Sequence, residues 1–369
     1  MTSTEQYIEL LRAGLWNRPA RVSSPVPLKE IFELAARQST LPLVYSAVLA
    51  IPEIKLPEKL KAQMSLVVDK CAKSHRAANT VIAFVTSDLE AAGIPSVLLK
   101  GQGIASYYPV PELRQAGDID IYVGSANYAK ACEIMGARFP KAEDDSDKHA
   151  CFHVGGSLYL ELHEFTEVLH PERLNRIYQA ISDEGTASAN AVARNLNGAD
   201  IPTPEDTFNA FYIFNHLWEH TRSMGIGIRQ LCDWAMFLHT HNGQLDSARL
   251  GRWLKELKLK NVWQVFGCAA VELLAISPED VPFYDPHKAK RGHRLARFIL
   301  DQGDNSEFKH GRGDSGSIKH KAGSLAFIFS RFARMARIFP KLAICKTMED
   351  IFRGAGKIFA IFVKRDQAD

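Results

Sequence analysis

The sequence predicts an α+β protein in which a small mixed β-sheet domain is flanked by an N-terminal and a C-terminal helical region. Apolar residues recur at helical spacing over much of 1–92 and 201–301, whereas the alternation typical of strands is found within 93–200. The 369 residues are 46% hydrophobic and 24% charged, which is ordinary for a folded protein with a sizeable core. Residues 302–369 form a fourth region of different composition.

Residues 1–92 are expected to be helical. The segments "YIELLRAGL", "LKEIFELAARQ" and "AANTVIAFVTSDLEAAG" have helical periodicity, and Gly93 is expected to end the last helix. The N-terminus has no basic segment ahead of its apolar residues, and the chain has no run of 18 apolar residues. We therefore expect a cytoplasmic protein. Its six cysteines, which form no C-x-x-C pair, are expected to be reduced core thiols.

The α/β region (93–200) has a distinct order of elements. "PSVLLK" (95–100) predicts a strand, "GIASYY" a short helix, "DIDIYV" (118–123) a second strand, and "SANYAKACEIMGA" a helix. "HACFHV" and "SLYLELHEF" flank Gly155 and Gly156, a pair that favours a tight hairpin turn.

The region 201–301 is expected to open with a helix at "TPED". Thr203 fits an N-cap, Pro204 the first helical position and Asp206 the acid of a capping box. Further helices are expected up to about residue 300, and the nearby Arg229 and Asp233 are spaced to form a salt bridge.

The last region (302–369) is predicted to be a flexible linker followed by a basic helical tail. Residues 309–369 contain 13 Lys or Arg and 5 Asp or Glu, a net charge of +8, which leaves −5 for the rest of the chain. In "FIFSRFARMARIF" aromatic and basic residues interleave at helical spacing. This pattern suits weak contact with an acidic membrane surface or with nucleic acid, but it is also what a helix packed on its own domain shows, which is the interpretation we favour.

Asp118 and Asp120 are the most informative pair in the sequence. On the expected strand their side chains share one face, about 6.6 Å apart along the backbone, while Ile119 and Ile121 take the other face. Two like charges at this distance repel each other unless a cation neutralises them. Carboxylate oxygens suit Mg²⁺ or Mn²⁺ bound together with substrate phosphates, so the pair predicts a metal site. The plainer alternative is a pair of acids at a solvated sheet edge.

The residues around this pair fit the same chemistry. In "LYLELHEF" the alternation puts Glu161 and His163 on one face. If that strand lies beside "DIDIYV", Glu161 becomes a third metal-binding carboxylate. Gly101 follows a strand and lets backbone N–H groups approach a triphosphate, and Lys100 and Arg114 add positive charge around this turn.

This arrangement resembles the nucleotidyltransferase superfamily that has the DNA polymerase β-like minimal fold. "LLKGQGIASYYP" with a following arginine, "DIDIYV" and "LELH" are similar to a bacterial family described as uncharacterised nucleotidyltransferase-like proteins, and the likeness extends over most of 1–260. It implies that Gly101 lies in the nucleotide-binding turn, that Asp118 and Asp120 are metal ligands and that Glu161 is the third acid. Lys100 and Arg114 match basic positions, which we expect to contact phosphate.

Two further positions bear on this site. Gln102 stands where the superfamily has a small residue, and its side chain is expected to crowd the triphosphate. His163 is expected to be a hydrogen-bonded strand histidine rather than a catalytic base.

The sequence thus predicts transfer of a nucleoside monophosphate from an NTP to an acceptor hydroxyl, with Mg²⁺ or Mn²⁺ and release of pyrophosphate. The acceptor stays open among an RNA end, a protein side chain, a small molecule and a sugar. One alternative is a non-catalytic nucleotide-binding scaffold. Another is a zinc hydrolase, because "HLWEH" fits the H-x-x-E-H pattern with His216, Glu219 and His220 on one helix.

Overall fold

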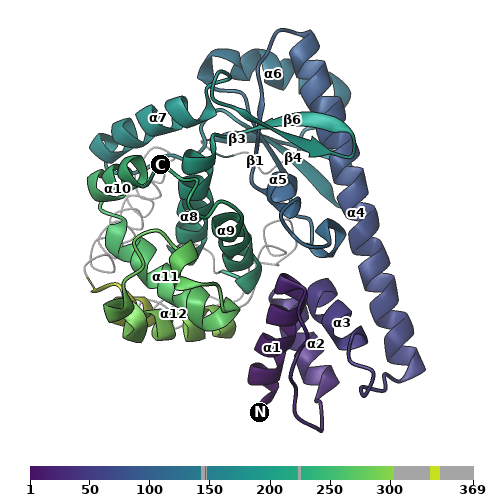
Figure 1. Ribbon diagram of the computed structural model, residues 1–369. Coiled ribbons are helices and arrows are strands. Elements are labelled where there is room, and N and C mark those ends of the chain that lie inside the picture. The colour runs from purple at the N-terminus through teal and green to yellow at the C-terminus, as the bar shows by residue number, and fades with distance from the viewer. Residues whose placement is uncertain (143–145, 147, 223–225, 303–332, 341–369) are drawn as a thin grey trace, which may run out of the picture.

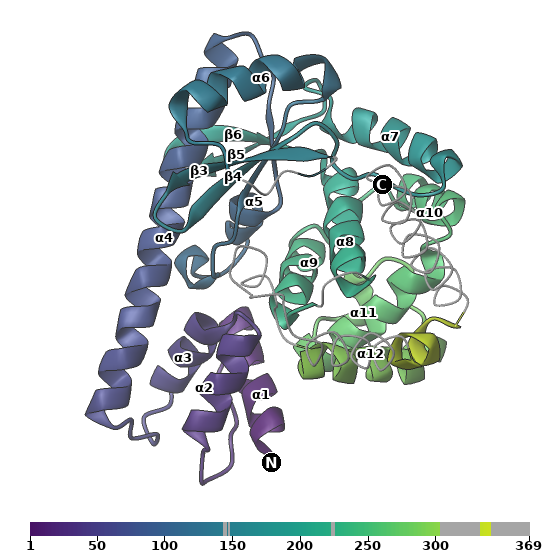
Figure 2. The ribbon, with the colours of Figure 1, turned by 180° about the vertical axis from the view of Figure 1, so that it is seen from behind.

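A computed structural model of the chain describes residues 1–142, 146, 148–222, 226–302 and 333–340. A small β-sheet lies at one end of the molecule and a body of helices at the other, and one long helix runs along both (Figure 1). The view from behind shows the same arrangement (Figure 2). The predicted α+β class is confirmed.

The N-terminal region is helical, as expected. It consists of α1 (Ser3–Trp16), α2 (Leu28–Arg37), α3 (Leu41–Leu49) and the long α4 (Glu58–Ala91). At the start of α1, the hydroxyl of Thr2 accepts a hydrogen bond from the Glu5 N–H, and the Glu5 carboxylate accepts one from the Thr2 N–H, so two otherwise unpaired donors are satisfied. Gly93 follows the end of α4 with φ +73°, which is the predicted left-handed stop.

Four strands form the main sheet in the order β1-β2-β4-β3. They are β1 (Val97–Leu99), β2 (Ile119–Tyr122), β3 (His149–Gly155) and β4 (Leu158–His163). β2 pairs with β4 in parallel and with β1 antiparallel, and β3 and β4 form the predicted hairpin. The sheet is therefore mixed, and β4 lies directly beside β2.

The two faces of this sheet differ in chemistry. Apolar side chains of β2 and β4 pack on one face against α4 and against α6 (Ser125–Arg138), which join them in one hydrophobic cluster. Leu99, Asp120 and Glu161 are neighbours in register, so they share the opposite face, and all three are buried. The alternation of residues in the sequence therefore predicted correctly which face of the sheet each of these side chains takes. Both faces of the sheet are covered by other parts of the protein.

The short helix predicted at "GIASYY" is α5 (Gly101–Ala105), which begins two residues earlier. The elements that were not predicted are the 3₁₀ turn η1 (Pro111–Leu113), α7 (Glu172–Thr186) and the hairpin of β5 (Val192–Leu196) and β6 (Ala199–Thr203). The expected cap at Thr203 is wrong. Thr203 belongs to β6, and its hydroxyl donates to the carbonyl of Val192 at 2.8 Å. The helix α8 (Asp206–Arg222) is capped instead by Glu205, whose carboxylate accepts from the N–H groups of Thr207 and Phe208.

The C-terminal helices pack against the N-terminal ones. They are α8, α9 (Ile228–Thr240), α10 (Ser247–Glu256), α11 (Lys260–Leu274) and α12 (Ala289–Gln302), with 3₁₀ turns η2 (Pro278–Asp280) and η3 (Pro286–Lys288). Residues of α1, α2 and α3 share one hydrophobic cluster with residues of α8, α9, α11 and α12. Two helical regions far apart in the sequence therefore form one body.

A short part of the basic tail, residues 333–340, is also described. Phe339 is 1% exposed, and its ring lies 5.0 Å from that of Trp218 and 6.3 Å from that of Phe266. This part packs on its own molecule, as we favoured. The predicted linker and the rest of the tail (303–332 and 341–369) lie outside the described residues.

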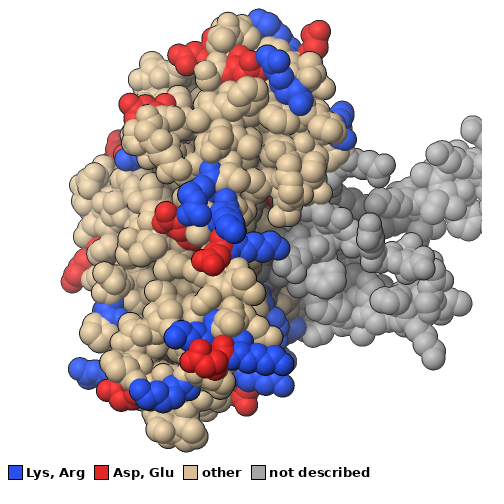
Figure 3. Space-filling view, turned by 90° about the vertical axis from the view of Figure 1, so that its right-hand side faces the viewer, with Lys and Arg blue, Asp and Glu red and all other residues tan. Residues whose placement is uncertain are grey.

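The described surface carries mixed charge. On the side along which α4 runs, Lys and Arg lie in small groups together with Asp and Glu, separated by uncharged surface (Figure 3). Within the described residues, no helix has the length and apolar character needed to cross a membrane. The cysteines in that part of the chain are free thiols, and most are buried, as expected.

Candidate active site

The turn between β1 and α5 brings a lysine to the polar face of the sheet. Lys100 and Gly101 both have positive φ, +38° and +51°, because the chain must turn sharply from the strand into the helix. Glycine adopts such a conformation without strain, whereas lysine rarely does. The Lys100 backbone is therefore held in an uncommon conformation at the position where the sequence predicted a phosphate-binding turn.

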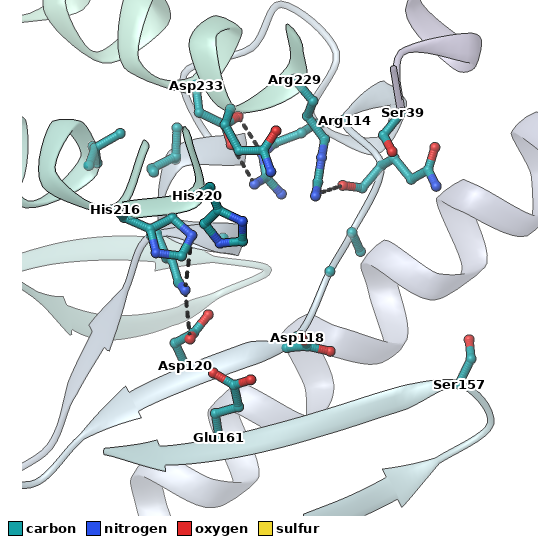
Figure 4. Close-up of a pocket in the computed structure, with 18 residues that line it drawn as sticks. Ser39, Arg114, Asp118, Asp120, Ser157, Glu161, His216, His220, Arg229 and Asp233 are labelled. Atoms are coloured by element: carbon teal, nitrogen blue, oxygen red, sulfur yellow. Dashed lines mark hydrogen bonds and ion pairs between the residues drawn. The ribbon is translucent and has the colours of Figure 1, made fainter. Parts of the chain in front are cut away.

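Lys100 lies between an acid of the sheet and a histidine of α8. Its Nζ is 2.9 Å from Oδ1 of Asp120 and 3.4 Å from Nε2 of His216 (Figure 4). Burial lowers the pKa of Lys100, but the nearby carboxylates of Asp120, Glu161 and Asp118 outweigh it, and the pKa is raised. Lys100 is therefore a half-buried cation of this site.

The three predicted carboxylates lie together. Asp120 and Glu161 are direct partners on β2 and β4 and are 3% and 6% exposed, and Asp118 comes just before β2. All three line one cavity of about 290 Å³. Burial raises the pKa of Glu161, but His163 and Lys100 lower it more strongly, so this pKa lies well below its usual range. Glu161 is therefore an anion at neutral pH.

Two histidines lie beside these acids. His163 Nε2 is 3.0 Å from Oδ1 of Asp120 and 3.4 Å from Oε2 of Glu161, while His149 Nδ1 is 3.6 Å from Oε2 of Glu161. His163 is hydrogen-bonded, as expected. His149 was missed, although the predicted hairpin about Gly155 and Gly156 places it across from His163. Desolvation by burial lowers the pKa of His149 to about 4, so its ring is neutral.

Arg114 lies in the cavity wall but is already bound to an acid. Its Nε and Nη2 donate to the two carboxylate oxygens of Asp233 on α9, at 2.7 and 2.8 Å, and Tyr108 donates to the same carboxylate. Nη1 of Arg114 is buried and has no hydrogen-bond partner within the described part of the chain. Of the three guanidinium nitrogens of Arg114, Nη1 is therefore the one that could make the expected contact with phosphate. Arg229 donates to the backbone carbonyl of Gln115 at 3.0 Å.

The expectation for Gln102 is wrong. Its side chain points away from the cavity and is 4% exposed. Nε2 donates to Nδ1 of His75 at 2.9 Å and to Oδ1 of Asn79 at 3.0 Å, both on α4. The first turn of α5 directs position 102 toward α4, so the glutamine anchors the turn and does not crowd a triphosphate.

The alternative zinc site at "HLWEH" is not among the metal-ligand groups that the described residues form. Glu219 is bound by Arg222, with N–O distances of 2.7 and 3.0 Å. Over the described ranges, the one group of three metal-type ligands is formed by His149, Glu161 and His163. His216 and His220 instead line the cavity, with their ring centres 4.4 Å apart. The apolar pattern of α8 predicted a core helix and did not indicate that these two histidines would line a cavity.

The cavity lies where three regions of the chain meet (Figure 4). The sheet domain contributes the acids, Lys100 and Gly101, α2's end contributes Ser39, and α8 and α9 contribute His216, His220, Arg229, Gln230 and Asp233. The sheet side carries the acids and Lys100, and the helical side carries two histidines, Arg229, Gln230 and the Asp233 that is paired with Arg114. Such a polar cavity suits a charged, hydrogen-bonding ligand.

Comparison with known proteins identifies the class of protein. The chain belongs to a nucleotidyltransferase family, described as "Uncharacterised nucleotidyltransferase", whose pattern matches residues 24–275. The matched range includes all of the acids, the glycine turn, and α8 and α9.

Comparison with individual proteins gave weaker results than comparison with the family. A search of curated proteins gave no match. One solved structure, an antigenic nucleotidyltransferase-like protein from Paracoccidioides brasiliensis, is similar at 13% identity with a TM-score of 0.32, covering 54% of this chain and 93% of that one. A likeness this low supports no argument about the present site.

Proposed function

We propose that the protein transfers a nucleoside monophosphate from an NTP to an acceptor hydroxyl and releases pyrophosphate. The observation that carries this proposal is the juxtaposition of Asp120 and Glu161 on parallel strands, with Asp118 beside them, in a cavity that begins at the Lys100–Gly101 turn. Membership of a nucleotidyltransferase family supports the reaction class.

The donor atoms fit Mg²⁺ or Mn²⁺. The contacts described above use Oδ1 of Asp120 and Oε2 of Glu161, so a hard cation would be held by the second oxygen of each carboxylate, with the Asp118 carboxylate as a further ligand. When bound, such an ion polarises phosphoryl oxygens and stabilises the charge of the leaving group. The low pKa of Glu161 fits a ligand better than a proton acceptor.

The other residues of the cavity bind and orient the substrates. In the transfer, the acceptor oxygen forms a bond to the α-phosphorus as the bond to the pyrophosphate oxygen breaks. Lys100 and Nη1 of Arg114 are placed to neutralise phosphate charge. The acceptor, whether RNA, protein, small molecule or sugar, would enter along the helical wall.

A second candidate is nucleotide binding without transfer. Lys100 forms an ion pair with Asp120 at 2.9 Å, so one of the acids that a metal would need is already neutralised. If this pair persists when nucleotide binds, the protein would be a sensor or scaffold.

Asp120→Asn tests the proposal, and Asp69→Asn, at an exposed position of α4, is the matched control. We expect one NTP with Mg²⁺, at a hundred times its dissociation constant, to stabilise the wild type and the control by roughly 2.7 kcal/mol. The Asp120→Asn variant should lose most of this stabilisation. Thermal shift against ATP, GTP, CTP and UTP, with and without Mg²⁺, measures it.

Pyrophosphate release in the presence of candidate acceptors then separates the two functions. Stabilisation by a nucleotide without release for any acceptor class favours the scaffold. If Asp120→Asn binds nucleotide and Mg²⁺ as well as the wild type does, the proposed site is wrong.

A further inference from the structure

The cluster of His149, Glu161 and His163 extends from the cavity, which Glu161 lines, into the protein behind it. Neither histidine lines the cavity, and the three side chains are 8%, 6% and 2% exposed. One ligand atom from each of them lies within 4.8 Å of the others. Nothing in the proposed transfer reaction requires two imidazoles behind Glu161.

The spacing of these atoms suits a tetrahedral metal ion. With bonds of 2.0 to 2.2 Å, two ligands of a tetrahedral Zn²⁺ are about 3.3 to 3.6 Å apart. Glu161 Oε2 lies 3.4 Å from Nε2 of His163 and 3.6 Å from Nδ1 of His149.

The orientation of His163 also favours a cation at this point. Its Nδ1 is 3.3 Å from the carbonyl oxygen of Phe165, which can only accept, so Nδ1 carries hydrogen. Nε2 then faces Oδ1 of Asp120 at 3.0 Å and Oε2 of Glu161 at 3.4 Å, so either a proton on Nε2 or a metal ion would occupy the point between these groups. An outer N–H···O=C bond of this kind is also the usual support of a metal-bound histidine.

His149 provides a second, independent observation. Its Nδ1 is buried and has no hydrogen-bond partner among the described residues, although it points at Oε2 of Glu161. A buried polar atom without a partner costs about 1–3 kcal/mol. A neutral imidazole nitrogen in this position is a ready metal ligand.

We propose that Nδ1 of His149, Oε2 of Glu161 and Nε2 of His163 form a binding site for a transition metal ion such as Zn²⁺, next to the catalytic acids. Imidazole ligands favour Zn²⁺ and Co²⁺ over Mg²⁺, which prefers oxygen. Glu161 would use Oε2 for this ion and its other oxygen for the cavity. The ion would fix the Glu161 carboxylate and reduce the repulsion between the acids.

The test uses the full-length protein freed of metal and titrated with Co²⁺, followed by competition with Zn²⁺. We expect one equivalent of Co²⁺ to bind with the strong visible absorption of tetrahedral Co²⁺, Zn²⁺ to displace it, and millimolar Mg²⁺ to leave it in place. His149→Ala should weaken Co²⁺ binding at least about 100-fold. His153→Ala is the matched control, because His153 lies on the same strand and its Nε2 contacts the carbonyl of Gly156 outside the cluster.

The titration of the wild type needs no variant, and His149→Asn replaces His149→Ala if the alanine variant does not fold. Absence of tetrahedral absorption, displacement of Co²⁺ by Mg²⁺, or wild-type affinity in His149→Ala would each overturn the proposal. Nucleotide binding with Mg²⁺ is measured separately on the same preparation. Failure of the transition-metal site and failure of the transferase proposal are therefore distinguishable.

Discussion

At the scale of single residues, Arg114 and Asp233 hold the sheet domain to α9. Both side chains are buried, and two parallel hydrogen bonds join them. Burial lowers the pKa of Arg114, but Asp233 raises it more, so the net pKa is raised and the pair stays charged. A buried pair of this kind depends on both partners, because either one alone would be an unneutralised charge.

Replacing Asp233 with alanine should therefore lower the free energy of unfolding by about 3–5 kcal/mol. The double variant Arg114→Met with Asp233→Leu should recover much of this loss, because no charge is left buried. Asp88→Ala is the control, since the Asp88–Arg138 pair lies at the surface and should be worth about 0–1 kcal/mol. Urea denaturation measures all three, and equal losses for Asp88→Ala and Asp233→Ala would contradict this account.

At the scale of elements, a polar network ties the turn between β1 and α5 to α4. Gln102 of α5 donates to Nδ1 and to the backbone carbonyl of His75, and Asn79 contacts Nε2 of the same ring at 3.3 Å. His75 is 5% exposed. Desolvation by burial is the main cause of its lowered pKa, so the folded protein favours the neutral ring.

This network should make stability depend on pH. Below its unfolded pKa of about 6.5, His75 binds a proton more readily in the unfolded chain than in the folded protein. The contribution of His75 to the free energy of unfolding is therefore present above pH 6.5 and is lost as the pH falls below 6.5. The free energy of unfolding should fall by at most about 1.4 kcal/mol per pH unit from this cause. In His75→Gln, the slope of unfolding free energy against pH should be smaller between pH 6.5 and 5. His287→Gln, at an exposed position, is the control. An unchanged slope in His75→Gln would assign the effect to other groups.

At the scale of the whole molecule, the two helical regions act as one support for the cavity. Gln38, at the end of α2, is 1% exposed and joins them. Its Nε2 donates to the carbonyls of Ile299 and Leu300 on α12, and its Oε1 accepts from the N–H of Ile228 at the start of α9. Ser39, the next residue, lines the cavity, so the docking of α2 also shapes the site.

Gln38→Ala should lower the free energy of unfolding by about 2–3 kcal/mol, because three backbone groups lose this hydrogen-bond partner, and two of them, the carbonyl of Ile299 and the N–H of Ile228, are in buried hydrogen bonds. Gln244→Ala, at an exposed position, should change it by less than about 0.5 kcal/mol. Chemical denaturation followed by tryptophan fluorescence measures both. A loss below 0.5 kcal/mol in Gln38→Ala would show that the two helical regions do not depend on this contact.

Much of the fold was predictable because it is encoded locally. Periodicity identified the helices of residues 1–92, and alternation around a glycine pair identified the hairpin of β3 and β4. The hairpin of β5 and β6 was missed, because "VARNL" and "ADIPT" carry few apolar residues and Pro202 is unusual within a strand. The helix start predicted at Thr203 was also wrong, because Thr203, although it is a residue type that often caps helices, belongs to the missed strand β6.

The sequence by itself predicted that Asp118 and Asp120 share one face behind a glycine turn and that Glu161 lies on a second strand, and in the structure β2 begins at Ile119, one residue after Asp118. Alternation fixes the face of each side chain, and that face needs no knowledge of distant residues. Only the tertiary structure decided what lies opposite that face, namely the histidines of α8, and it also decided the partner of Arg114 and the direction of Gln102. These contacts join residues from tens to more than a hundred positions apart. They depend on which helix packs against which face, and local spacing carries no information about that choice.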